Sequence, residues 1–184
     1  MKNIYKKFIK AMEKSNVIML ERSGNNYFIS NSHVILKISE YVYDSFFRIE
    51  SPIFVELKDG QFGRYQKNSN KITSISEEGC KLDTLMSVKE IEIVNKNKFS
   101  NFMLDLKDTV IRWMKINNND FMAVNNVYYE MFNDIFPNAE WHYSTKKNPL
   151  IHVDADTYEN DALILPINYD PDELNEFISI EKES

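Results

Sequence analysis

The chain has 184 residues, a formal net charge of −6, 43% hydrophobic residues and 13% aromatic residues. This length and apolar content exclude a disordered chain and predict one folded domain, or two small ones, with a hydrophobic core. The one cysteine, Cys80, excludes an intramolecular disulfide and favours a reducing compartment. No apolar run approaches the ~20 residues of a membrane helix, so we expect a soluble cytoplasmic protein.

The first part of the chain predicts a helix followed by strands. Apolar side chains recur at helical spacing over residues 3–15, with lysines on the other faces. Three strands are predicted next, over residues 17–21, 27–30 and 33–38. Ser39 can then cap a short helix, because its hydroxyl can accept a hydrogen bond from a free N–H of the first turn. That helix carries Tyr43, Phe46 and Phe47.

The strongest local signal is a hairpin in the middle of the chain. Residues 53–58 and 61–66 flank Asp59-Gly60, a pair that suits the positive φ angles of a two-residue turn. A weaker strand is predicted over 71–76, and residues 77–100 are ambiguous except for strand-like alternation over 89–94. A linker between two halves would lie near residues 77–82 or 95–101.

The second part predicts a strand–helix–strand–strand–strand unit with one extra strand in front. A hairpin is predicted from residues 110–116 and 120–124, and Asn125 is a candidate N-cap for the helix that follows. Pro137 prevents that helix from continuing beyond its end. Three further strands are predicted over residues 140–143, 150–153 and 162–167.

One pattern occurs twice in the chain. Residues 38–46 align with residues 124–132 at a constant offset of 86 positions. The matching pairs are Tyr43 with Tyr129, Asp44 with Glu130, and Phe46 with Phe132. A repeat of this kind indicates one domain built from two similar halves, about 17–94 and 101–168. The alternative is a chance similarity between two amphipathic aromatic helices.

Three stretches between residues 120 and 168 resemble the half-domain repeat of DNA sliding clamps, especially the bacterial β clamp. Residues 121–125 followed by Tyr128-Tyr129 look like the strand-to-helix step of a clamp half-domain. Residues 149–153 look like the next core strand, and residues 162–167 look like the final strand, where a proline follows apolar residues. The resemblance implies an α+β fold, mostly antiparallel sheet with short helices, whose two similar halves form one clamp-like domain. It also implies an accessory role in DNA metabolism.

The charges depart from the clamp pattern. Sliding clamps line their DNA-facing hole with basic helices and use six such domains, whereas this chain has material for one. Its corresponding helices are acidic, with Arg48 as their cation; the acids are Glu40, Asp44, Glu130 and Asp134. From Asp154 onward the net charge is −9. Such a chain repels phosphate backbones on average, so DNA would be bound weakly or indirectly.

Two groups of charged residues are candidate binding residues. Lys6, Lys7 and Lys10 of the first helix could contact phosphates, with a solvated helix face as the alternative. The acidic tail, residues 170–184, could attract a basic or nucleic-acid-handling protein, with solubility as the alternative. Its candidate partner-binding residues are Asp170, Asp172, Glu173 and Glu176. We expect no membrane contact, and the oligomeric state is open.

No catalytic signature emerges from the sequence. Glu140, His142, His152 and Asp154 lie on neighbouring predicted strands, but a four-residue turn would pair His142 with Ile151 and put the two histidines on opposite faces. Cys80 lacks a nucleophile motif, His33 follows a turn and is expected to be structural or solvated, and the glycines form no phosphate loop. We expect no metal, no cofactor and no enzymatic activity.

The sequence therefore predicts a non-enzymatic protein that binds macromolecules. The first hypothesis is a clamp-like accessory factor in the DNA metabolism of a phage or mobile element. The second is an acidic inhibitor, of the anti-defence type, that blocks a nucleic-acid-binding protein. A small metal-dependent enzyme is a third alternative.

Overall fold

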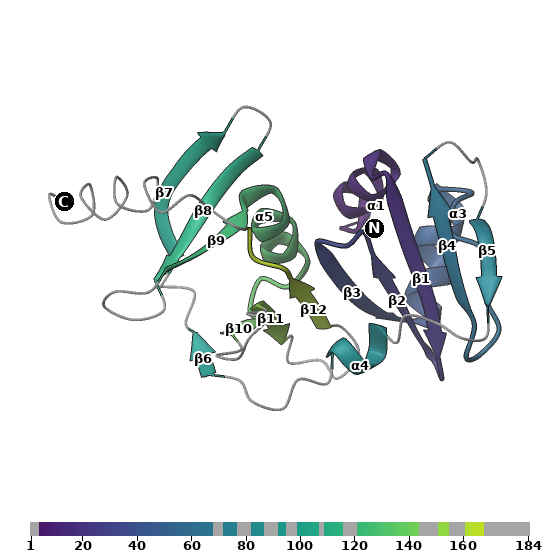
Figure 1. Cartoon of the computed structure of the whole chain (residues 1–184). Helices are drawn as coiled ribbons and strands as arrows, with labels where there is room; N and C mark the ends of the chain where they lie inside the picture. The colour runs from purple at the N-terminus through teal and green to yellow at the C-terminus, as the bar shows by residue number, and fades with distance from the viewer. Residues whose placement is uncertain are drawn as a thin grey trace, which may run out of the picture.

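The computed structural model describes residues 4–67, 72–76, 82–86, 92–94, 99–106, 109–115, 121–143, 151–154 and 161–167 (Figure 1). Within these ranges the fold is α+β, with mostly antiparallel sheet and short helices, as the sequence predicted. No helix among the described residues is long and apolar enough to cross a membrane.

The larger sheet has nine strands in the order β5-β4-β1-β2-β3-β12-β11-β10-β6. The strands are β1 (Val17–Ser23), β2 (Asn26–Ser30), β3 (Val34–Ser39), β4 (Phe62–Gln66), β5 (Ile72–Ser76), β6 (Glu92–Val94), β10 (Glu140–Tyr143), β11 (Ile151–Asp154) and β12 (Asp161–Ile164). The pairing of β3 with β12 places Leu36 opposite Ala162 and Val34 opposite Ile164. Strands from the two ends of the chain therefore join at the centre of one sheet.

A second, three-stranded antiparallel sheet holds β7 (Phe99–Leu106), β8 (Thr109–Lys115) and β9 (Phe121–Asn125). Figure 1 shows this sheet beside the larger one, with α5 (Asn126–Ile135) between them. An isolated bridge pairs Ala123 of β9 with Ile167, just after β12. The sequence predicted β8 and β9 as a hairpin but did not predict β7.

The helical steps of the two predicted halves begin in the same way. Ser39 caps α2 (Glu40–Val42) by accepting a hydrogen bond from Val42 N–H, and Asn125 caps α5 by accepting one from Val127 N–H. The two caps are 86 positions apart, which is the offset of the sequence repeat. Each cap follows a strand paired with the strand before it. The division into two similar halves stays a prediction, while this strand–cap–helix step occurs twice.

The first of these helices contains an extra residue in one turn. The five residues of η1 (Tyr43–Phe47) form a π-helix between α2 and α3 (Arg48–Glu50). A π turn closes a hydrogen bond between residues five apart, whereas an α-helix closes one between residues four apart. Here the Arg48 N–H donates to the Tyr43 carbonyl, five residues earlier. Residues 40–50 are therefore one continuous helix with a π turn in its middle.

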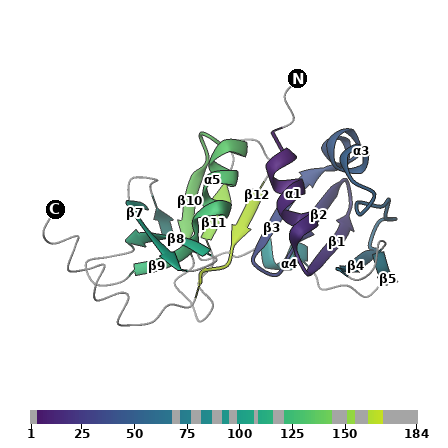
Figure 2. The same cartoon turned by 90° about the horizontal axis from the view of Figure 1, so that it is seen from above.

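The main core lies between the sheet and helices on one of its sides. Helix α1 (Lys6–Lys14) crosses the sheet between α3 and α5, as Figures 1 and 2 both show. Phe8 of α1 is fully buried and contacts Phe47 of η1 and Phe132 of α5, with ring centroids 6.2 and 5.9 Å apart. Helix α1 therefore fastens both capped helices to the same core.

The other side of the sheet carries a smaller apolar cluster. Its buried members are Phe28, Ile35, Leu82, Met86 and Leu163, and two of them belong to helix α4 (Leu82–Met86), which the sequence did not predict. Buried Glu21 of β1 accepts a hydrogen bond from the Leu82 N–H at the start of α4. The central strands are therefore covered on both faces.

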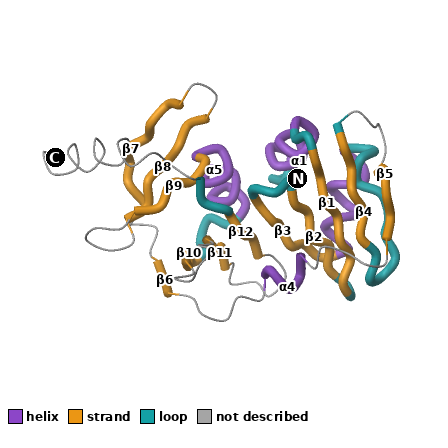
Figure 3. Tube along the Cα trace, viewed as in Figure 1, coloured by secondary structure: helices purple, strands orange, loops and turns teal. Residues whose placement is uncertain are grey.

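The predicted hairpin around Asp59-Gly60 is wrong, although its turn is present. Gly60 has a φ of 78°, and the Gln61 N–H donates to the Lys58 carbonyl at 3.0 Å. However, β4 pairs with β1, placing Val17 opposite Gln66, and residues 53–58 form a loop (teal in Figure 3).

Side chains from β2 and η1 hold this loop in place of a strand partner. The Tyr27 hydroxyl donates to the Leu57 carbonyl at 3.2 Å, and the Tyr43 hydroxyl donates to the Val55 carbonyl at 2.8 Å. The rings of Tyr27 and Tyr43 stack with centroids 3.7 Å apart. Because these hydroxyls bind carbonyls that a strand would present to its neighbour, the loop folds over the core instead of pairing with β4.

Strand β12 is shorter than predicted. It ends at Ile164, so Leu163 and Leu165 do not share a face as the predicted strand 162–167 required. Leu163 is buried against α4 and Ile164 is buried in the main core, whereas Leu165 is 39% exposed. Pro166 explains the early end, because it has no N–H to donate to a strand ladder.

The two leucines give a matched pair of variants. Leu163→Ala should lower the free energy of unfolding by about 2–5 kcal/mol, because it leaves a cavity in a packed cluster. Leu165→Ala should change it by only about 0.5 kcal/mol, because the side chain lies outside the core. Urea unfolding followed by circular dichroism measures both. Equal losses for the two variants would contradict this assignment of β12.

Glu21 predicts a pH dependence of stability. Burial raises the pKa of its carboxyl; the Leu82 N–H opposes this effect, and repulsion from Asp83 adds to it. A carboxyl with a raised pKa in the folded state stabilises the fold most below its unfolded pKa, and this contribution is lost as pH rises through the folded pKa. Glu21→Gln should therefore gain stability relative to the original protein between about pH 4 and pH 7. Parallel urea-unfolding profiles across that range would argue against it.

Candidate macromolecule-binding site

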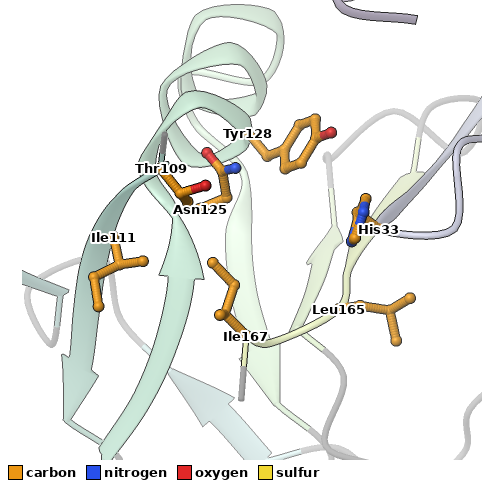
Figure 4. Close-up of a pocket in the computed structure, with 7 residues that line it drawn as sticks. All are labelled: His33, Thr109, Ile111, Asn125, Tyr128, Leu165 and Ile167. Atoms are coloured by element: carbon orange, nitrogen blue, oxygen red, sulfur yellow. The ribbon is translucent and has the colours of Figure 1, made fainter. Parts of the chain in front are cut away.

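A pocket of about 380 Å³ opens where the two sheets meet. Its walls come from β8, from the end of β9 and the start of α5, from the turn between β2 and β3, and from the segment after β12 (Figure 4). The lining residues are His33, Thr109, Ile111, Asn125, Tyr128, Leu165 and Ile167. We call this the junction pocket.

The segment 165–167 forms one wall because it binds both sheets. The Leu165 N–H donates to the His33 carbonyl at 2.7 Å, and the Ile167 N–H donates to the Ala123 carbonyl at 2.8 Å. If the Ala123–Ile167 bridge continued as an antiparallel ladder, it would pair Asn125 with Leu165. Leu165 instead bonds to the larger sheet, so β9 and this segment diverge beside the pocket.

Asn31 fixes the polar wall of the pocket. Its amide nitrogen donates to the Tyr128 hydroxyl at 2.7 Å and to the Ser15 hydroxyl at 3.0 Å. Its side-chain oxygen accepts the backbone N–H groups of His33 and Val34. One buried side chain therefore joins the β2–β3 turn to α5 and to the end of α1.

Tyr128 and His33 stand on this fixed support. Their rings stack with centroids 6.4 Å apart. Burial raises the pKa of the Tyr128 hydroxyl, with the Asn31 hydrogen bond acting in the opposite direction, so the hydroxyl is neutral near neutral pH. Opposite them, Ile111 and Ile167 belong to an apolar cluster with Trp113 and Phe121. The pocket thus combines an apolar side with oriented polar groups, as ligand-binding pockets commonly do.

The predicted DNA-binding lysines are exposed on α1, but they are not equivalent. Lys7 forms an ion pair with Asp134 of α5. This hydrogen bond and the charge of Asp134 raise the pKa of Lys7, with a further contribution from Glu130. Lys6 and Lys10 lie on the same helix and are also exposed. A polyanion that approached α1 would therefore compete with the carboxylates of α5 for Lys7.

The acids of the capped helices have partners within the protein. Glu40 pairs with Arg22 at 2.8 Å. Arg48 pairs with Asp44 at 2.9 Å and with Glu56 at 3.2 Å. Glu130 accepts a hydrogen bond from Asn126. These carboxylates therefore have a structural use beside any role toward a partner.

The register of the strands that carry Glu140, His142, His152 and Asp154 differs from the expectation. Strand β10 places His142 opposite His152 and Tyr143 opposite Ile151, one position from the pairing that would separate the histidines. His142 is buried, and its Nε2 lies 3.7 Å from a Glu140 carboxylate oxygen. Across the described ranges, no three His, Cys, Asp or Glu side chains gather as a metal site.

Several predicted residues lie outside the described ranges. They include Cys80 and the four acids of the tail, Asp170, Asp172, Glu173 and Glu176. The sequence also missed the junction pocket, because its walls are far apart in the chain. One local signal was available: Pro166 in an apolar strand indicates where the strand ends and an irregular segment begins.

Comparison with known proteins gives one likeness of fold. No family model matches the chain, and no curated protein matches it. A structure search finds similarity to the beta chain of DNA polymerase III from Streptococcus pneumoniae TIGR4, with 10% sequence identity and a TM-score of 0.36. The match covers 92% of this chain and 65% of that chain, so it spans less than two thirds of the bacterial protein. A likeness at this level assigns no partner and no activity.

The charge arrangement predicts weak binding of free DNA. Within the described part of the chain, α1 is the helix that groups exposed lysines, and Asp134 holds one of them, so the gain from counterion release on this helix is small. We expect a dissociation constant on the order of 10⁻⁴–10⁻⁶ M or weaker for a labelled duplex at physiological salt. Fluorescence anisotropy measures it, and Asp134→Asn should strengthen binding by releasing Lys7.

Lys58 on the Asp59-Gly60 turn supplies the control, because it is an exposed lysine that does not belong to α1. Lys58→Ala should leave the weak binding unchanged, while the triple replacement of Lys6, Lys7 and Lys10 by Ala should remove it. Tight duplex binding that the triple variant abolishes would refute weak binding and favour a direct role on DNA.

Proposed function

We propose that this chain is a non-enzymatic accessory factor in DNA metabolism, of a phage or mobile element, that binds a protein partner through the junction pocket. DNA is contacted weakly by α1 or indirectly through that partner. The short clamp-like motifs between residues 120 and 168 support the link to DNA metabolism, and the junction pocket supports the mode of binding.

The pocket is the observation that carries this proposal. Hydrogen bonds from Asn31 and from the Leu165 and Ile167 N–H groups position its lining, so the chain itself shapes the pocket. Preformed walls reduce the entropy lost when a partner binds. Its lining suits apolar contact and hydrogen bonding, and His33 and Tyr128 are the ionisable side chains in that lining. A role in binding a partner explains this lining, and no catalytic role is needed to explain it.

Leu165 allows the pocket to be tested without damaging the core. The immobilised protein should capture DNA-replication or repair proteins from extract of its own host, identified by mass spectrometry. Leu165→Ser should reduce that capture about tenfold, because it removes an exposed apolar wall of the pocket. Leu85→Ser is the matched control, since Leu85 is 45% exposed on α4 and is not one of the residues that line the pocket.

The capture experiment can fail in two informative ways. Equal loss for Leu165→Ser and Leu85→Ser would exclude the pocket as the binding site. Capture that depends on Leu165 but contains no protein of DNA metabolism would retain a binding role and exclude the proposed pathway.

An acidic inhibitor of a nucleic-acid-binding protein is the second candidate, and the net charge of −9 from Asp154 onward favours it. Charge attraction would speed the encounter with a basic partner. Replacement of Asp170, Asp172, Glu173 and Glu176 by Asn or Gln should then slow association with the captured partner, measured by surface plasmon resonance. An unchanged association rate would exclude this candidate, whatever the result for Leu165.

A further inference from the structure

The helix formed by residues 40–50 presents two large apolar side chains to solvent. Tyr41 and Ile49 are each 77% exposed, more than any other large apolar residue in the described ranges. Single exposed apolar residues are common on protein surfaces and need no explanation. Tyr41 and Ile49 are a candidate binding surface because of their relative position on this helix.

The π turn aligns Tyr41 with Ile49. Two turns of α-helix contain about seven residues, so residues eight apart drift away from one another around the helix axis. One π turn adds roughly one residue, so one α turn and one π turn together contain about eight. Tyr41 and Ile49 are separated by eight positions that include η1. They therefore lie on one line along the helix, with Ser45 between them; we call this the outer stripe.

The helix beneath the outer stripe is rigidly fixed. Tyr43 and Phe47, on its inner side, are fully buried. Tyr43 stacks on Tyr27 and donates to the Val55 carbonyl, and Phe47 contacts Phe8 and Phe54. A surface held in this way loses little conformational entropy when a partner binds.

The surroundings of the stripe are acidic. Residues 40–56 carry four acids and one base, a net charge of −3. Glu40, Asp44 and Arg48 each precede a stripe position by one residue and so lie along one flank of it. On that flank Glu40 pairs with Arg22 and Asp44 pairs with Arg48. Glu56, on the loop beside the helix, is also paired with Arg48 and is well exposed. The stripe is thus an apolar line with an anionic border.

We propose that the outer stripe is a docking surface for a basic amphipathic helix of a protein partner. The apolar face of such a helix would cover Tyr41 and Ile49, and its flanking lysines or arginines would face the acidic border. The stripe is roughly 12 Å long, which equals about two turns of a helical ligand. Duplex DNA fits less well, because its phosphates would meet the acids and its backbone offers no apolar face.

This surface is separate from the junction pocket, because none of the residues that line the pocket belongs to residues 40–50. The inference therefore does not depend on the proposed function. Variants of the stripe and of Leu165 test the two independently.

The test uses a fluorescein-labelled helical peptide of leucine and lysine as the probe and measures its affinity by fluorescence anisotropy. Tyr41→Ser/Ile49→Ser should bind the peptide at least about tenfold more weakly than the original protein. Ile75→Ser/Leu85→Ser, which removes two exposed apolar residues elsewhere, should bind within about twofold of it. Thermal unfolding midpoints of all three proteins establish that they are folded.

A charge variant and a cross-link add independent readouts. Glu50→Gln/Glu56→Gln should slow association and flatten its dependence on salt, because screening acts on the charges it removes. A benzophenone placed on Ser45→Cys in a Cys80→Ser background should cross-link the peptide, whereas the same group on Thr84→Cys should not. Loss of affinity in the stripe variant with selective cross-linking at position 45 supports the proposal.

Three results would overturn it. The first is that the original protein does not bind the peptide at a peptide concentration of about 1 mM, because a dissociation constant weaker than this indicates no specific surface. The second is equal affinity for the stripe variant and its control. The third is that the original protein binds duplex DNA and that the stripe variant loses this DNA binding but still binds the peptide.

Discussion

The contact of Phe8 with Phe47 and Phe132 holds the two parts of this protein together. The nine-stranded sheet is continuous, but its two groups of strands meet where β3 pairs with the short strand β12. Phe8 lies over the core with no exposed surface and contacts one aromatic ring from each capped helix. Large aromatic side chains bury more apolar surface than other residues, so this triad strengthens the joint beyond its ladder of hydrogen bonds. The junction pocket and the outer stripe both depend on helices that it anchors.

The π turn changes how the sequence repeat relates to the core. In the sequence, Phe46 aligns with Phe132 at the offset of 86. In the structure, Phe8 contacts Phe132 and Phe47, which is one position later than Phe46. Phe46 itself is half-buried beside Tyr5. An extra residue within η1 accounts for a shift of one position. The same extra residue brings Tyr41 and Ile49 into line on the surface. The π turn therefore explains both the packing of Phe47 in the core and the alignment of the two exposed side chains.

Local signals in the sequence predicted the local structure well. Ser39 and Asn125 cap the helices that were expected after them, because a cap depends on hydrogen bonds within a few residues. The Asp59-Gly60 turn also formed, because glycine accepts the positive φ that it needs. The partner of β4 was wrong, since the hydroxyls of Tyr27 and Tyr43 that hold residues 53–58 come from distant positions. The junction pocket was missed for the same reason: His33, Ile111 and Ile167 meet only in the folded chain.

Both proposed binding surfaces arise where regular structure is interrupted. Strand β12 ends two residues before Pro166, and Leu165 keeps one backbone hydrogen bond to the larger sheet while its side chain lies on the wall of the junction pocket. The π turn likewise brings into line two apolar residues that a regular α-helix would offset by about 80° around its axis. Sequences that agree with their fold at every level bury such residues, and departures concentrate at functional sites. The charge around each surface then determines which kind of partner it favours. The described pocket lining has no acidic side chain, while acids border the outer stripe, so one surface selects by shape and the other by charge as well.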